Sequence, residues 1–401
     1  MTAAVLSSPT PVERRARFAV AVLFFTNGAL FANLLPRYPQ IKADLEIANA
    51  TYGLAVAAFP AGAITAGLAA GTLIRRWGSA RVAVGSTLLV GGSVLAAGLA
   101  ESVLLFAGAL FLAGAMDAIT DVAQNAHGLR VQRRYGRSII NSFHAIWSIG
   151  AVTGGAMAAG AIALDLSRGT HLSIAVVLFA VVAFLALRFC LPGPDTEPTS
   201  EADRGDEAGG SPRAVGGARI AWLLTAFVLI ATAGTLVEDA GNSWAALYLS
   251  DALSASAALA ASGYIALVGA QFVGRLVGDR LVNRFGQRAV ARAGGLITAV
   301  GMGTALAVPT VPGTIVGFAA AGLGVATLVP AAMHEADELP GLKPGTGLTL
   351  VSWLMRLGFL LSPPVVGLIA DATSLRVGLL VVPFAGLVVL ALAGALRARS
   401  R

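Results

Sequence analysis

Long runs of apolar residues alternate with short polar segments along the whole chain. Each run is long enough to form a helix that crosses the hydrocarbon layer of a membrane, for which about 20 residues suffice. The pattern predicts twelve such helices, at residues 18–36, 51–74, 82–100, 103–127, 138–163, 171–190, 220–249, 255–277, 288–309, 313–333, 346–369 and 376–396. The sequence therefore predicts an all-α membrane protein.

The composition supports a membrane protein. Hydrophobic residues make up 56% of the chain and charged residues 12%, and the mean hydropathy is +0.78. A soluble protein has about twice that share of charged residues. The 48 glycines suit helices that pack closely through small residues. The single cysteine excludes an intrachain disulfide.

The basic residues indicate a lipid partner and an orientation. The net charge of +7 would fit nucleic acid if the basic residues were clustered, but they lie mostly in the short loops between apolar runs. With the N-terminus inside, 23 of them fall in inner segments and 4 in outer segments. The positive-inside rule then predicts that both termini are cytoplasmic. We expect contact with a lipid bilayer and no nucleic acid partner.

The polar segment 191–219 divides the chain in two. It is rich in Pro, Gly, Asp and Glu, so it cannot bury much apolar surface, and we expect a flexible cytoplasmic linker. Residues 1–190 then form an N-terminal six-helix bundle, and residues 220–401 form a C-terminal one.

The two halves carry similar segments. Residues 67–78 (GLAAGTLIRRWG) follow the second predicted helix, and residues 274–286 (GRLVGDRLVNRFG) end the second helix of the other half. Both combine spaced glycines with basic residues. The candidate gating residues in these loops are Gly71, Arg75, Arg76, Gly78, Gly274, Arg275, Asp279, Arg284 and Gly286. Two repeated bundles with a site between them are typical of transporters that rock between two states.

An acidic stripe lies in the run 103–127. Asp117, Asp121 and Asn125 are four residues apart, which places them on one face of a helix, within about 80° of each other. A carboxylate near the middle of a membrane helix costs about 3 kcal/mol, so such acids are usually functional. The stripe predicts a polar cavity, with Asp117 as the stronger candidate for a proton site. The alternatives are a structural ion pair or a position near the membrane surface.

The seventh run contains a second polar group. Glu238 and Asn242 are four residues apart and share a helix face, whereas Asp239 is expected to point elsewhere. Gly234 and Gly241 flank the acids, which predicts a helix that is broken where it lines a cavity.

The same group has a second interpretation. Glu238 and its neighbours could lie at the outer water interface, with Trp244 and Tyr248 in an aromatic belt. The sequence favours neither position for Glu238, and it favours the belt for Tyr248.

Arg356 is the basic residue that lies inside a predicted span. Its guanidinium stays charged at any relevant pH, so it needs a carboxylate, a bound anion or water. Asp117, Asp121 and Glu238 are candidate partners. Such a pair would be structural, or it would break when a proton or solute arrives and so couple the two halves.

Two residues of the fifth run are further candidates. His144 could relay protons, because the ordinary pKa of histidine is about 6.5, although packing against a neighbouring helix is the commoner role. Trp147 could stack on a sugar ring or simply pack.

Several segments together resemble the major facilitator superfamily, and within it the bacterial fucose permease-like branch. The resemblance covers essentially the whole chain and is carried by FFTNGALFANLLPRYPQIKADL (24–45), DVAQNAHGLRVQRRYGRSIINSFHAIWSIGAVTGG (121–155), EDAGNSWAALYL (238–249), GRLVGDRLVNRFG (274–286) and GFLLSPPVVGLIADATSLR (358–376). It implies a fold of two six-helix bundles, transport by alternating access, and a place in the cytoplasmic (inner) membrane of a bacterium.

The chain departs from this pattern in places. Arg75 stands where the first signature loop usually has an acid, and Asn283 stands at the matching place in the second loop, with Asp279 one turn earlier as a possible substitute. The sugar permease has an acid in its first span. Here Asn27 and Asn33 are the amide candidates, so sugar specificity does not transfer.

These observations favour a proton-coupled secondary transporter that moves a small polar, possibly sugar-like, solute. The sequence has no nucleotide-binding P-loop, and we expect no cofactor. The alternatives are proton-driven export of an amphipathic metabolite or drug, and a membrane sensor that does not transport. The four histidines lack metal-ligand spacing, so an enzyme is disfavoured. A monomer is expected, because the repeat supplies a complete pathway within one chain.

Overall fold

The chain folds into membrane-spanning helices. The computed structural model describes residues 10–136, 139–193, 217–342 and 346–397. In this described part, twelve helical segments are long and apolar enough to cross a membrane, and each overlaps one of the predicted runs. The prediction of an all-α membrane protein with twelve spanning helices is confirmed. Most of the predicted linker, residues 194–216, lies outside the described residues.

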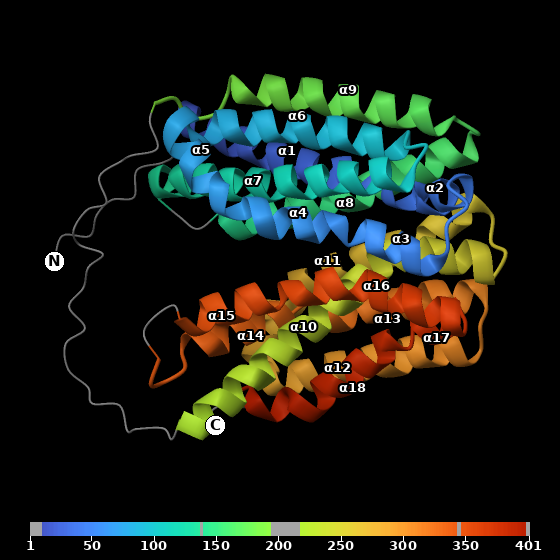
Figure 1. Cartoon of the computed structure of the whole chain (residues 1–401). Helices are drawn as coiled ribbons and strands as arrows, with labels where there is room; N and C mark the ends of the chain where they lie inside the picture. The colour runs from blue at the N-terminus through green and yellow to red at the C-terminus, as the bar shows by residue number, and fades with distance from the viewer. Residues whose placement is uncertain (1–9, 137–138, 194–216, 343–345, 398–401) are drawn as a thin grey trace.

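The two halves of the chain lie against each other (Figure 1). The first half contains α1 (Pro11–Ala32), η1 (Leu35–Arg37), α2 (Tyr38–Asp44), α3 (Asn49–Val56), α4 (Ala58–Ala66), η2 (Gly67–Ala69), α5 (Ala70–Trp77), α6 (Ser79–Gly98), α7 (Val103–Tyr135), α8 (Ile140–Ala163) and α9 (Arg168–Leu187). The second half contains α10 (Gly217–Leu247), the π-helix η4 (Tyr248–Ala252), α11 (Ala257–Phe285), α12 (Gln287–Ala307), α13 (Val311–Val325), α14 (Leu328–Asp337), α15 (Thr346–Leu354), α16 (Arg356–Ala372), α17 (Leu375–Gly378), α18 (Val381–Leu392) and η5 (Ala393–Ala395).

Matching helices of the two halves start and stop in the same way. The Ser102 hydroxyl caps the first turn of α7, and the Thr310 hydroxyl caps that of α13. Gly78 ends α5 with a φ of 84°, and Gly286 ends α11 with a φ of 82°. A side chain rarely adopts this backbone conformation, so glycine is needed at both stops. The sequence repeat is thus also a structural repeat.

Each half also binds the chain where it leaves the last helix. In the first half, the Leu191 N–H donates to Nε2 of His127 at 3.1 Å. The Arg130 guanidinium donates to the carbonyl oxygens of Pro192 and Gly193 at 2.5 and 3.1 Å. In the second half, the buried Glu335 accepts from the Arg397 N–H at 3.3 Å and pairs with its guanidinium at 3.2 Å. These contacts fix the start of the predicted linker and the start of the C-terminal tail.

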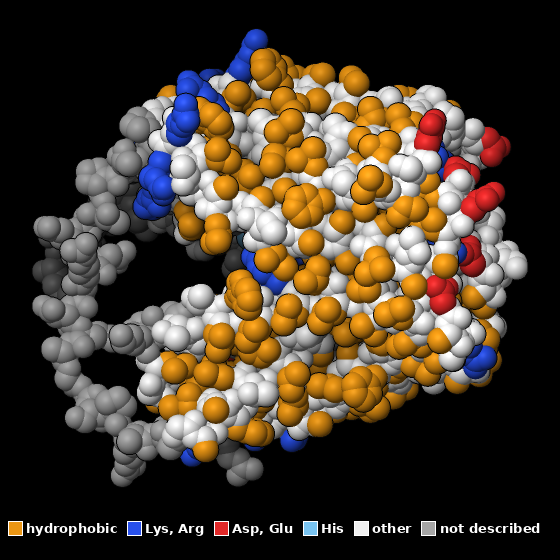
Figure 2. Space-filling view, in the orientation of Figure 1, with side chains coloured by type: hydrophobic (Ala, Val, Ile, Leu, Met, Phe, Trp, Pro, Cys, Tyr) orange, Lys and Arg blue, Asp and Glu red, His pale blue; other side chains and the backbone are white. Residues whose placement is uncertain are grey.

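Charge separates the two ends of the molecule (Figure 2). At one end, which we call the basic end, α5 and α7 finish and α10 begins, and exposed residues there include Arg75, Arg76 and Arg133. The opposite acidic end carries exposed Asp44, Asp371 and other acids. Figure 2 shows that the two halves diverge toward the basic end and meet toward the acidic end, with an apolar surface between the two ends.

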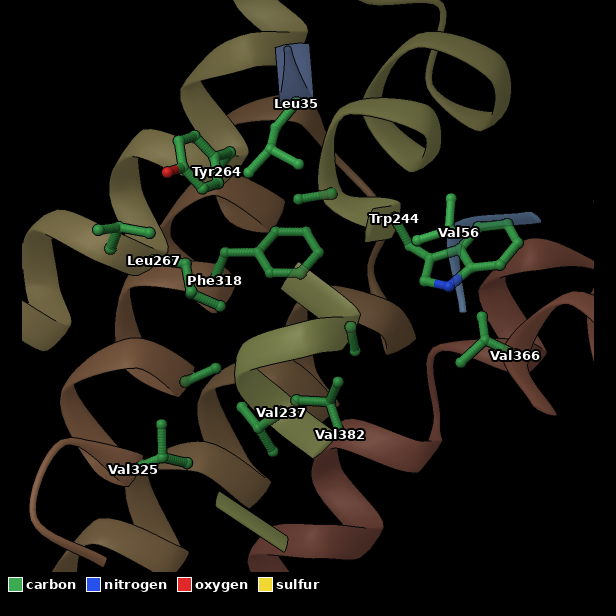
Figure 3. Close-up of a cluster of buried hydrophobic side chains, with 14 of the residues drawn as sticks. Leu35, Val56, Val237, Trp244, Tyr264, Leu267, Phe318, Val325, Val366 and Val382 are labelled. Atoms are coloured by element: carbon green, nitrogen blue, oxygen red, sulfur yellow. The ribbon is translucent and has the colours of Figure 1, made fainter. Parts of the chain in front are cut away.

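The most extensive contacts between the halves are those of α8 with α11 and of α3 with α16, and smaller ones join α10 to α2 and α16 to α4. The buried apolar cluster is continuous across this contact. Figure 3 shows part of it, in which Val56 of α3 lies beside Trp244 of α10 and Val366 of α16. Apolar packing therefore holds the halves together near the acidic end.

Polar contacts close the acidic end. The Asp371 carboxylate of α16 accepts from the backbone N–H groups of Asn49 and Ala50, at 3.0 and 2.8 Å, and from the Asn49 side chain at 2.9 Å. These N–H groups belong to the first turn of α3, where a helix presents unpaired donors and a positive dipole end. A residue of the second half therefore caps a helix of the first half. Lys42 and Asp251 add an ion pair across the halves at 3.7 Å.

Two glycines allow α3 and α16 to approach this closely. A Cβ on Gly53 would lie 2.3 Å from the Pro363 carbonyl oxygen, and a Cβ on Gly367 would lie 2.4 Å from the Asn49 carbonyl oxygen. Any side chain at either position would push the two helices apart. The closed acidic end depends on backbone contact between the halves.

We expect Asp371→Asn to favour opening of the acidic end. The amide keeps one acceptor but sets an NH₂ group against the α3 N–H groups and removes the charge that stabilises the helix start. Loss of a helix cap costs about 1 kcal/mol, which changes the ratio of two states about fivefold. The measurement is the distance between spin labels on cysteines at the exposed positions Glu101 and Thr373, in a variant that lacks Cys190.

Asp165→Asn is the matched control. Asp165 is also an exposed acid at the acidic end, and its φ of 52° suits asparagine. An equal change of the distance distribution in the two variants would show that the Asp371 cap does not hold the acidic end closed.

Candidate functional site

A cavity of about 270 Å³ lies between the two halves. Its polar wall combines acids, amides and one guanidinium from both halves, and aromatic rings form much of the rest. The residues that line it are Asn27, Gly28, Phe31, Ala32, Leu35, Tyr38, Val56, Phe59, Pro60, Ala63, Ile64, Asp117, Trp147, Ala151, Glu238, Asp239, Asn242, Ser243, Tyr264, Val268, Gln271, Arg356 and Phe359.

Asp117 is the carboxylate that the first half contributes. Its position on α7 places it near α1, where the Asn27 side chain lies close enough to interact with the carboxylate. Trp147 of α8 lines the same wall. The structure thus brings together three predicted site residues from three helices of one half.

The other two residues of the acidic stripe lie outside the cavity wall. Asp121 is exposed, and its carboxylate accepts a hydrogen bond from the Asn125 side chain at 2.9 Å. The predicted stripe of Asp117, Asp121 and Asn125 therefore lies on one face of α7, but its inner part faces the opening toward the basic end.

The negative charge of Glu238 has its partners within the second half. Its carboxylate accepts a hydrogen bond from Gln271 of α11 at 2.7 Å and lies 3.7 Å from the Arg275 guanidinium, also of α11. Both partners stand on the helix that packs beside α10. The candidate gating residue Arg275 is thus a partner of a cavity acid, and Glu238 is not the ion-pair partner of Arg356.

Asp239 also lines the cavity and is only 6% exposed. One of its carboxylate oxygens accepts from the Ser243 hydroxyl at 3.3 Å, and Ser362 of α16 adds a second hydroxyl contact. The expectation that Asp239 points away from the cavity is wrong. Residues of α2, α3 and α16 line the cavity together with α10. The cavity therefore extends around α10 far enough for the adjacent residues Glu238 and Asp239 both to line it.

The predicted break of the seventh helix is wrong as well. Residues Gly217–Leu247 form one continuous helix through both glycines. A Cβ on Gly234 would lie 3.3 Å from the Val329 side chain, and a Cβ on Gly241 would lie 2.2 Å from the Leu267 side chain. These glycines allow close packing of neighbouring helices, which is the other common use of glycine in membrane bundles.

Tyr248 and Trp244 do not form an aromatic belt. Their exposed fractions are 1% and 0%, so both rings are buried in the core of the protein. The Trp244 ring meets the edge of the Tyr52 ring of α3, with centroids 5.0 Å apart. The Tyr52 hydroxyl donates to the Ser243 carbonyl oxygen at 2.8 Å. This end of α10 binds the first half of the chain instead of the membrane surface.

Arg356 marks an interruption of the eleventh span, because α15 ends at Leu354 and α16 begins at Arg356. The carbonyl oxygen of Met355 at this junction accepts from the Thr235 hydroxyl of α10 at 2.9 Å. Arg356 lines the cavity and is exposed toward the opening. In the described part of the chain, no carboxylate oxygen lies within 4.0 Å of its guanidinium, although Asp121 lies close enough to interact electrostatically.

His144 faces the opening rather than the cavity. Its ring is exposed, meets the edge of the Phe24 ring with centroids 5.3 Å apart, and lies within electrostatic range of Asp121 and Arg275. The remaining candidates, Asn27 and Asn242, both line the cavity.

The two candidate gating loops lie at the basic end and differ in packing. In the second half, a Cβ on Gly274 would lie 2.6 Å from the Ala326 Cβ, so α11 and the α13 region are in close contact. In the first half, the nearest atom to a Cβ on Gly71 is Nη1 of Arg75, at 3.5 Å. The two loops therefore differ in how closely their glycines are packed against other helices.

The charged residues of these loops are exposed. The Arg76 guanidinium lies 5.5 Å from the centre of the Trp77 ring, and the Arg284 guanidinium lies 5.3 Å from the centre of the Phe285 ring. The two loops therefore share this contact between an arginine and the aromatic ring that follows it. Asp279 is exposed as well.

Sequence reasoning missed three residues of the site: Tyr38, Tyr264 and Gln271. Gln271 stands three residues before Gly274 in a helix whose polar residues are few, and this was the available signal. Tyr38 and Tyr264 follow Pro and Gly residues in segments that look like helix ends, and nothing in the sequence indicates that they face a cavity.

Comparisons with known proteins agree with this architecture. The family model described as Major Facilitator Superfamily matches residues 20–282 and again residues 239–401. Among curated proteins, the chain is 31% identical over 372 residues to the uncharacterized transporter y4wD of Sinorhizobium fredii, covering 92% of this chain and 95% of that protein. It is 29% identical over 375 residues to the membrane protein MosC of Rhizobium meliloti, covering 92% and 88%.

Solved structures of transporters share the fold. The nucleoside transporter NupG superposes with a TM-score of 0.71 at 12% identity, over 96% of this chain and 99% of that one. A D-xylose-proton symporter superposes with a TM-score of 0.67 at 14% identity, over 95% of each chain. The relatives and the family model together show that the chain is a membrane transporter, not an enzyme, and that it belongs to the Major Facilitator Superfamily.

Proposed function

We propose that the chain is a proton-coupled secondary transporter that carries a small polar solute across the cytoplasmic membrane of a bacterium. The main support is that carboxylates from both halves line one cavity: Asp117 from α7, and Glu238 and Asp239 from α10. A site built from both halves can change its access when bundles 1–190 and 220–401 rock against each other.

The charge distribution supports an orientation. The basic end corresponds to the cytoplasmic side under the positive-inside rule, which places both termini there. The cavity then faces an opening to the cytoplasm, and the contacts of Asp371 with α3 close the outer side. We assign the structure to the inward-open state of an alternating-access cycle.

Asp117 is the proposed proton site. Its neighbour Asn27 carries both a donor and an acceptor, so it can satisfy the Asp117 carboxylate and also the protonated acid. The Glu238 carboxylate already has a charged partner, because the Arg275 guanidinium lies 3.7 Å away. Of these two acids, Asp117 is the one whose surroundings tolerate both charge states.

The polar part of the cavity wall supports a small polar solute, although most of the lining residues are apolar or aromatic. Export of a drug would call for a wide apolar cavity with one accessible acid. This cavity is about 270 Å³ and presents the amides Asn27, Asn242 and Gln271 together with Trp147. Trp147 presents an aromatic ring in the wall on which a sugar-like solute can stack.

Asp117→Asn should abolish proton-driven accumulation of solute and leave the protein folded. The amide can still form a hydrogen bond with Asn27 but cannot take up a proton. The solute is first identified by a thermal-shift screen of sugars, sugar acids, amino acids and cationic drugs, because a ligand of the native state raises its melting temperature. Uptake is then measured in proteoliposomes with an imposed pH gradient.

Glu101→Gln is the matched control, since it also removes one negative charge, from an exposed position away from the cavity. It should retain full uptake. Uptake by Asp117→Asn with the same rate and the same pH dependence as the unchanged protein would rule out Asp117 as the proton site.

Counterflow separates a transporter from a sensor with the same fold. Proteoliposomes loaded with unlabelled solute should accumulate labelled solute transiently without any proton gradient, because exchange needs only the movement of the loaded carrier. We expect Asp117→Asn to retain at least part of this exchange. A solute that binds tightly but shows no counterflow in the unchanged protein would favour the sensor.

A further inference from the structure

Asp239 is a buried carboxylate without a cation. It is 6% exposed, and its contacts are the hydroxyl groups of Ser243 and Ser362. In the part of the chain that the structure describes, no Lys or Arg nitrogen lies within 4.0 Å of it, whereas Glu238 next to it has Arg275. A buried charge without a partner is costly, so a compensating group is expected at this place.

Three residues of the cavity wall carry buried oxygen atoms without a hydrogen-bond partner, and two of these residues, Tyr38 and Asp239, lie close enough to interact electrostatically. The second oxygen of Asp239, the side-chain oxygen of Asn242 and the Tyr38 hydroxyl are each buried and have no hydrogen-bond partner. All three residues line the cavity, and they come from both halves. Two of the three atoms are pure acceptors, and the third can accept. A ligand that satisfies them must present several donors.

The other residues of the cavity wall indicate whether the hydrogen-bond donor of the ligand is charged or neutral. The aromatic rings of Tyr38, Tyr264 and Phe359 line the cavity, and their faces attract cations. Arg356 is the guanidinium in the wall, but it is exposed toward the opening and interacts with Asp121. In the described part of the chain, the cavity acids Asp117 and Asp239 have no Lys or Arg nitrogen within 4.0 Å, and Asp239 is the one of the two with an unsatisfied buried oxygen.

We propose that Asp239, Asn242 and Tyr38 form a subsite for the protonated amino group of the transported solute. An ammonium group supplies three donors to the three free oxygens and the positive charge that Asp239 lacks. This inference rests on the proposed function, because it names a part of the transported solute, but binding can be measured without transport.

The experiment compares matched amine and hydroxyl compounds. Purified protein in detergent is titrated calorimetrically with glucosamine and glucose, and with ethanolamine and ethylene glycol, all of which are small compared with the cavity. The amine of each pair should bind at least about tenfold more tightly than its hydroxyl counterpart, as a charge-assisted hydrogen bond provides.

Two substitutions locate the binding to the subsite. Asp239→Asn keeps the shape of the side chain and should remove the preference for the amine. Tyr38→Phe removes only the hydroxyl group and should weaken amine binding about fivefold, with an unchanged melting temperature of the free protein. Glu101→Gln serves as the control and should bind the amines as the unchanged protein does.

The outcomes separate the subsite from the proposed function. Equal affinities within each pair, or amine binding that survives both substitutions, would overturn the subsite. If Asp239→Asn does not fold, the affinities of Tyr38→Phe decide. Amine binding that depends on Asp239 but is never followed by counterflow would support the subsite and argue against transport.

Discussion

Compensation of buried carboxylates is the constraint on which the central cavity depends. Water cannot solvate a charge in the apolar middle of a membrane protein, so each acid needs its own partners. The structure uses three kinds. Glu238 has the guanidinium of Arg275, Asp117 has the amide of Asn27, and Asp239 has hydroxyl groups. The three acids therefore differ in the chemical nature of their neighbours, and only Glu238 has a cation beside it in the described part of the chain.

The same constraint acts on backbone groups at the acidic end. The first turn of α3 has N–H groups with no partner within the helix, and it sits where the halves meet. Asp371 of the other half satisfies them, so this contact forms only when the acidic end is closed. At the basic end, the nearest atom beyond its own helix backbone to a Cβ on Gly71 would be Nη1 of Arg75 at 3.5 Å, so no other helix packs against this glycine in the present state.

The sequence predicted the helices well because the length of an apolar run is a local property. The spacing of Asp117 to other polar residues also indicated a cavity position, whereas for Glu238 the sequence left the cavity and the outer interface open, and the structure places both in the cavity wall. The sequence failed for Asp239 and Tyr38, whose roles depend on the helices that surround α10 and α2. Gly234 and Gly241 were interpreted as a break in the seventh helix. A sequence does not show whether a glycine bends its own helix or allows a neighbouring helix to pack closely against it.

Ser243 joins the cavity to the closed acidic end. Its hydroxyl donates to Asp239, which lines the cavity, and its carbonyl oxygen accepts from Tyr52, which belongs to the other half. A group that binds the free oxygen of Asp239 acts on the carboxylate that also accepts from Ser243, and a shift of this turn of α10 would change the geometry of the Tyr52 hydrogen bond. Tyr52 also contacts Trp244 and Tyr38, so the shift would act on the aromatic packing between the halves. Occupation of the cavity and closure of the acidic end therefore act on the same turn of one helix, as coupling between a site and a gate requires.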